Sequence, residues 1–155
     1  MALNISYQLT GVGWAQCSIA DDQSTCTVSA SYLSDALCAL VLSANALLSR
    51  FSRVTFSFDE EPGEYRWVIS SPRLNEMKIQ ILSLTELWGD KPDSEGTLMF
   101  STACTPETYA EAVHAAAGAV LAEHGEARYR EKWSEFPFPM AQFEQLSRNL
   151  ARLRE

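Results

Sequence analysis

Carboxylate side chains around one Pro-Gly pair are the densest group of chemically active residues in this chain. Two carboxyl groups held about 5 to 9 Å apart can share acid and base roles in hydrolysis. That chemistry needs burial to separate the two pKa values, whereas a Pro-Gly turn is typical of an exposed position. We therefore interpret the group as a surface for a positively charged partner. It consists of Asp59, Glu60, Glu61 and Glu64 around Pro62-Gly63.

A thiol and two imidazoles are the other candidates for catalysis. Cys104 precedes Thr105, a predicted helix N-cap, and helix N-termini lower thiol pKa values. His114 and His124 lie about 15 Å apart along one predicted helix, too far to share a metal ion. The sequence contains no nucleotide-binding, zinc-protease, serine-hydrolase or calcium-loop motif. We expect structural roles for these side chains, no cofactor or metal, and no enzymatic activity.

The charge balance of the chain favours a protein partner. The sequence has 155 residues, with 20 Asp and Glu against 12 Lys and Arg and a formal net charge of -8. A negative field opposes binding to phosphate backbones and speeds encounter with a basic protein. We therefore expect no nucleic-acid binding. The sequence also lacks a secretory signal pattern and a run of about 18 apolar residues, so we expect a cytoplasmic protein without a membrane span.

Alternating apolar and polar residues predict seven strands. The predicted strands cover residues 5–9, 13–20, 26–31, 54–58, 65–69, 77–81 and 97–104. Pro62-Gly63 stands between two of them and predicts a tight hairpin with Gly63 at positive φ. The segment from Asp90 to Gly96 is predicted to be an exposed loop.

Apolar residues at helical spacing predict three helical regions. They cover residues 35–51, 106–124 with a short continuation over 126–135, and 140–152. Thr105 is the predicted N-cap of the second helix, and Gly125 is predicted to end it.

The predicted element order is β-β-β-α-β-β-β-β-α-α-α, which indicates one α+β domain over residues 1–155. Short connections between sequential strands favour antiparallel pairing. We expect a single twisted, mainly antiparallel sheet of six to seven strands with the helices on one face. The other face of such a sheet is left to water or to a partner.

The predicted partner-binding surface joins the Pro-Gly turn to the loop that follows two strands later. Aromatic side chains dominate binding at many interfaces, and Tyr65 and Trp88 are the two expected to be partly exposed. If Trp67 points inward, alternation places Tyr65 inward as well. The complete predicted set is Asp59, Glu60, Glu61, Glu64, Tyr65, Trp88, Asp90, Asp93 and Glu95.

Three segments of the sequence resemble a group of small uncharacterised bacterial proteins. They are Leu33 to Leu37, the run FDEEPGEYRW from Phe58 to Trp67, and Phe136-Pro137-Phe138-Pro139. The resemblance covers most of the chain and implies an independent bacterial domain. In size, acidity and lack of motifs the chain is also similar to immunity proteins of polymorphic toxin systems. That similarity implies neutralisation of a toxin through an acidic surface.

Three functions are open on the sequence alone. The first, which we favour, is a non-enzymatic cytosolic protein-binding domain whose acidic surface meets a basic protein. The second is a small-ligand-binding protein or enzyme with a pocket between sheet and helices, lined by Trp88, Tyr109 and His114. The third is a homodimer or larger homo-oligomer formed through an exposed sheet face.

Overall fold

The computed structural model describes residues 2–60, 62–86, 91–133 and 136–155. In chain order the elements are β1 (Asn4–Gly11), β2 (Trp14–Ala20), β3 (Thr25–Ser31), α1 (Ala36–Leu48), β4 (Arg53–Asp59), β5 (Glu64–Arg73), β6 (Glu76–Leu84), the 3-10 turn η1 (Asp93–Glu95), β7 (Thr97–Cys104), α2 (Pro106–Trp133) and α3 (Met140–Leu153). The predicted strands and the predicted α+β class are therefore confirmed.

The strands form two antiparallel sheets, so the prediction of a single sheet is wrong. One sheet has the order β1-β2-β3 and the other has the order β4-β5-β6-β7. The helix α1 lies between β3 and β4 in the chain, so these two strands cannot form a tight hairpin, and within the described ranges they belong to different sheets. They approach each other where the Ser31 hydroxyl donates a hydrogen bond to the Asp59 carbonyl oxygen at 2.9 Å.

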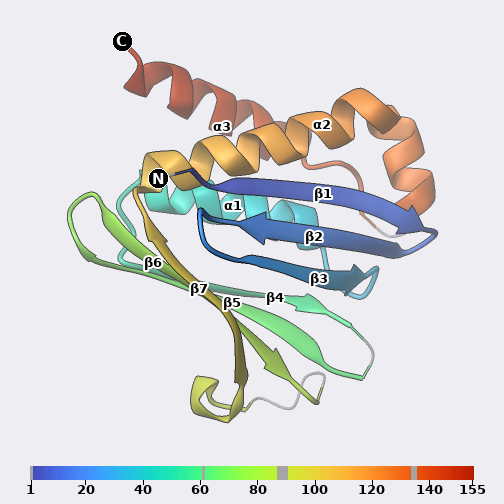
Figure 1. Ribbon diagram of the computed structural model, residues 1–155. Coiled ribbons are helices and arrows are strands. Elements are labelled where there is room, and N and C mark those ends of the chain that lie inside the picture. The colour runs from blue at the N-terminus through green and yellow to red at the C-terminus, as the bar shows by residue number, and fades with distance from the viewer. Residues whose placement is uncertain (1, 61, 87–90, 134–135) are drawn as a thin grey trace.

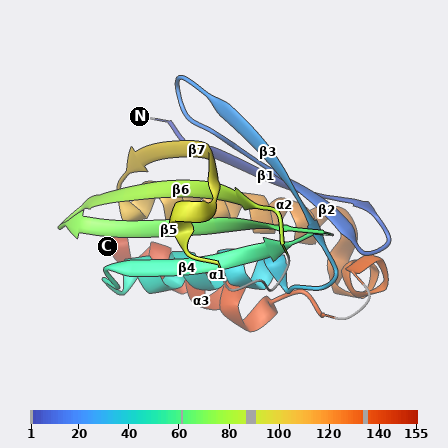
Figure 2. The ribbon, with the colours of Figure 1, turned by 90° about the horizontal axis from the view of Figure 1, so that it is seen from below.

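All three helices lie on one side of the two sheets, as Figures 1 and 2 show. The helix α1 packs against β4, α2 packs against β1 and α1, and α3 packs against α1 and α2. Both sheets and all three helices contribute side chains to one apolar core. The largest fully buried side chains include Trp67, Trp133, Tyr109, Tyr129 and Phe58. Burial of aromatic side chains of this size is a dominant stabilising contribution in protein cores.

The predicted start of α2 and the predicted break within it are both present. The Thr108 amide donates a hydrogen bond to the Thr105 hydroxyl oxygen at 3.1 Å, which is the geometry of an N-cap. Gly125 interrupts α2 with φ 70° and ψ 171°. Positive φ carries no steric penalty in glycine, so the chain turns there and then continues to Trp133.

The β4–β5 hairpin is anchored in the core, as the alternating sequence predicts. Phe56 pairs with Trp67 across the two strands, and their rings stack with centroids 5.4 Å apart. The predicted positive φ at Gly63 is wrong, because Gly13 and Gly125 are the described glycines with positive φ. Glycine is needed at position 63 because a Cβ atom would collide with the Leu84 carbonyl oxygen.

Candidate functional site

The described carboxylates of the predicted binding surface lie at the β4–β5 hairpin and on the side of the four-stranded sheet that holds segment 91–96. Asp59 ends β4 and stands opposite Glu64, the first residue of β5. Glu64 is only 9% exposed, and its carboxylate accepts a hydrogen bond from Arg66 at 3.1 Å. The Asp59 amide donates a hydrogen bond to the Ser34 hydroxyl oxygen at 3.1 Å. These two residues therefore help to hold the hairpin in place.

Arg66 ties the hairpin to the segment 91–96, which we call the strap. Its guanidinium donates hydrogen bonds to the Lys91 carbonyl oxygen at 2.7 Å and to the Asp93 carboxylate at 2.9 Å. Arg53 donates to the other Asp93 carboxylate oxygen at 3.0 Å. The hydrogen bond from Arg66 is the main reason why the pKa of Asp93 is lowered. The two arginines therefore neutralise part of the predicted acidic surface and hold the strap against the sheet.

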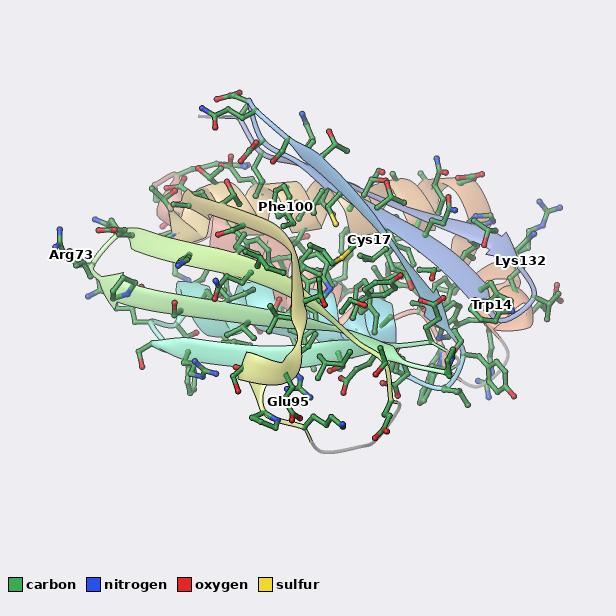
Figure 3. The ribbon with its side chains drawn as sticks, turned by 60° about the horizontal axis from the view of Figure 1, so that its bottom comes forward. Trp14, Cys17, Arg73, Glu95, Phe100 and Lys132 are labelled. Atoms are coloured by element: carbon green, nitrogen blue, oxygen red, sulfur yellow. The ribbon has the colours of Figure 1, made fainter. Side chains whose placement is uncertain are left out.

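The other predicted binding residues have different surroundings. Tyr65 packs against the core on the inward side, as its alternation with Trp67 indicates. Burial and the neighbouring Glu60 carboxylate raise the pKa of Tyr65. Glu95 is exposed on the strap, as labelled in Figure 3. The remaining three, Glu61, Trp88 and Asp90, lie outside the described residues.

The first half of β7 is an open sheet edge. β7 is the last strand in the order of its sheet, and Leu98 and Met99 on it are 53% and 46% exposed. Within the described ranges, the backbone of residues 97–101 makes hydrogen bonds to no segment besides β6. The strand has the sequence TLMFSTAC, which lacks the charges and prolines that often protect an edge from pairing with another chain. The β6–β7 register shifts between Ile81 and Leu82, so Met99 stands opposite no residue of β6, as in a β-bulge. The second half of β7 is covered differently, since the Thr102 hydroxyl donates to Asp21 at 2.7 Å.

A groove of about 610 Å³ opens where α1 and α3 end and α2 begins. The volume falls in the range of small-molecule sites. Its apolar walls include Leu47, Leu48, Leu74 and Leu153, and its charged residues are Arg50, Arg73 and Glu107. This groove could not be predicted from the sequence, because residues from four separate segments of the chain converge on it.

The residues predicted to line a pocket are used elsewhere. Tyr109 is fully buried, and its hydroxyl lies 2.7 Å from the Ser43 hydroxyl. His114 lies 2.7 Å from the Ser147 hydroxyl and stacks on Phe143 with ring centroids 4.8 Å apart. Neither Tyr109 nor His114 lines the end groove, and Trp88, the third residue predicted for a pocket, lies outside the described residues.

Two residues of the groove have an unusual backbone conformation. Arg50 and Asn75 are the non-glycine residues with positive φ in the described part of the chain, at 68° and 62°. Arg50 follows the end of α1, where its amide donates to the Leu47 carbonyl and the Phe51 amide donates to the Ala46 carbonyl. This arrangement is a Schellman motif, whose left-handed position favours glycine. A side chain at that position costs about 1 kcal/mol.

The thiols and the imidazole of His114 lie in partly or fully buried surroundings. All four cysteines are free. Burial raises the pKa of Cys104 to about 11, so the helix start does not activate this thiol as its position in the sequence suggested. Burial also lowers the pKa of His114, with a further contribution from Arg154. In the described part of the chain, no group of three or more His, Cys, Asp or Glu side chains could hold a metal ion.

None of the described helices combines the length and the apolarity needed to span a membrane. The described residues form an α+β fold with two antiparallel sheets, in which β7 is an edge strand and a groove lies where α1 and α3 end. Comparison with known proteins finds no matching family model, no matching curated protein and no matching solved structure. The similarity to small bacterial proteins and to immunity proteins therefore stays a prediction from the sequence.

Proposed function

We propose that this chain is a non-enzymatic protein-binding domain that adds an extended segment of its partner to the open edge of β7. The observation that carries the proposal is the exposure of Leu98 and Met99 on an uncharged edge strand. An added strand gains affinity from main-chain hydrogen bonds, while its side chains set the specificity. The raised pKa of Cys104 makes this thiol a poor nucleophile.

Charge selects the partner. Glu95 stands two residues before the start of β7, and the whole chain has a net charge of -8. The partner strand should place apolar side chains beside Leu98 and Met99 and a Lys or Arg near Glu95. Such a strand would match both the apolar edge and the negative charge. The partner is thus a basic protein, as the sequence suggests, but its contact shifts from the hairpin tip to the strap and β7. A basic toxin would be one partner of this kind.

Selection from a random peptide library tests the proposal. We expect enriched peptides to alternate apolar and polar residues and to carry Lys or Arg at one end. The bound peptide should shift the ¹⁵N resonances of residues 97–101, and methylation of alternate peptide amides should abolish binding because main-chain hydrogen bonds are lost. Met99→Lys should weaken binding about tenfold or more, since it places a charge on the edge.

Leu74→Lys is the matched control, because Leu74 is 71% exposed on the β5–β6 turn. It should bind the selected peptides with unchanged affinity. Peptides whose binding shifts no resonance of β7, or whose affinity is insensitive to amide methylation, would contradict strand addition.

A further inference from the structure

We propose that the end groove binds a small molecule with an apolar chain and a carboxylate head. The groove lies at the ends of α1, α2 and α3 and does not include β7. This site goes beyond the proposed protein-binding function, and its occupation does not depend on a partner strand.

The apolar part of the groove would receive the chain of the ligand. Leu47 comes from α1, Leu74 from the β5–β6 turn, and Leu153 from the last turn of α3. Leu74 and Leu153 remain 71% and 52% exposed, so this wall is in contact with water. An apolar chain lying between these leucines would remove both surfaces from water, which is favourable in proportion to the area covered.

The charged part of the groove would bind the head group. In the described part of the chain Arg50 makes no ion pair, and Arg73 reaches Glu76 at 3.9 Å with both side chains largely exposed. Arginine presents a planar set of donors that matches a carboxylate. Glu107 lines the same groove and opposes an anion by its like charge. The start of α2 contributes little, because Pro106 has no amide hydrogen and the Thr105 hydroxyl oxygen already accepts a hydrogen bond from the Thr108 amide.

The backbone at Arg50 favours a role for its side chain. Glycine would fit the left-handed conformation at φ 68° without the steric penalty that arginine incurs. A residue kept in an unfavourable conformation is common at ligand sites. Asn75, the other non-glycine residue with positive φ, also lines the groove, but asparagine adopts this conformation readily in a turn and adds no argument of its own.

Three eight-carbon probes with different head groups test this inference: octanoate, octanol and octylamine. We expect octanoate to shift the amide resonances of Arg50, Arg73 and Asn75, and to bind about fivefold more tightly than octanol. Octylamine should bind most weakly. Arg50→Gly should reduce the affinity for octanoate about fivefold and leave that for octanol unchanged, while the melting temperature stays equal or rises. Glu107→Gln should tighten octanoate binding about twofold by removing the like charge.

Equal affinities for the three probes, or an unchanged preference for octanoate in Arg50→Gly, would overturn the inference. Arg73→Ser provides a second test at an arginine that is 82% exposed, where folding is not at risk. Met99→Lys should leave octanoate binding unchanged. This variant therefore distinguishes a failure of strand addition at β7 from a failure of ligand binding in the groove.

Discussion

Arg66 determines how much of the acidic charge near the β4–β5 hairpin is available to a partner. Its side chain is 12% exposed and contacts Glu64, Asp93 and the Lys91 carbonyl oxygen. Removing one member of a nearly buried ion-pair network leaves charges without compensation, which costs more than the network contributes when intact. Arg66 is therefore a structural residue that holds the strap against the four-stranded sheet.

Arg66→Ala should destabilise the fold by about 2 to 3 kcal/mol, because Glu64 would stay nearly buried without its counterion. Urea denaturation measures this change. Arg73→Ala is the matched control, since its pair with Glu76 is long and exposed, and it should change stability by less than about 0.5 kcal/mol. Equal stabilities for the two variants would show that the Arg66 contacts do not hold the strap.

Asp93 should make stability depend on pH in the acid range. Its pKa in the folded chain lies below the ordinary value of 3.8, because Arg66 and Arg53 stabilise the carboxylate. The resulting stability is present above about pH 4 and is lost as the pH falls through the lowered pKa. Asp93→Asn should therefore show a shallower loss of unfolding free energy between about pH 4 and pH 2 than the parent chain. Parallel pH profiles for the two chains would contradict this assignment.

At the scale of elements, the local pattern of apolar residues was sufficient to predict the strands and helices but not how the strands are divided between sheets. The alternation of Val54, Phe56 and Phe58 fixes β4 and its inward face, because side chains of a strand alternate between two faces. The division into two sheets depends instead on how α1 packs, and that packing involves residues distant in sequence. The open edge of β7 is likewise a property of its neighbours, although its uncharged sequence was a usable signal.

The role of Arg66 could have been found from the sequence. Glu64 and Arg66 are two residues apart on one strand and therefore share its outer face. Opposite charges at that spacing indicate an ion pair, so part of the acidic surface could have been recognised as neutralised. The partner Asp93 could not be identified in the same way, because the strap reaches Arg66 from 27 residues away in sequence.

Gly63 should be the more sensitive of two hairpin glycines. Gly63→Ala would place a Cβ atom against the Leu84 carbonyl oxygen and separate the hairpin from the end of β6. We expect a loss of at least about 2 kcal/mol, the upper part of the range for overpacking a closely packed site. Gly11→Ala is the control, since nothing lies within 4 Å of the added atom. Thermal unfolding of both variants compares the two sites, and equal melting temperatures would contradict the close approach.

At the scale of the whole molecule, the net charge and the open edge of β7 have opposite effects on association between two copies of the chain. An unprotected edge strand can pair with the same strand of a second copy. At neutral pH each copy has a net charge of -8, and like charge opposes such an encounter. Repulsion between copies therefore opposes edge-to-edge pairing, which charged side chains on β7 would otherwise have to prevent.

This balance predicts self-association near the isoelectric point of about 4.8. The chain should be monomeric at pH 7.5 and form dimers or larger species near pH 4.8, as measured by light scattering after gel filtration. The Asp93 carboxylate stays ionised at that pH and keeps its contact with Arg66, because its pKa lies below 3.8. Met99→Lys should reduce the association by adding a charge to the edge, while Leu74→Lys, which changes the net charge equally, should not. Equal association of the two variants would show that an edge other than β7 is responsible.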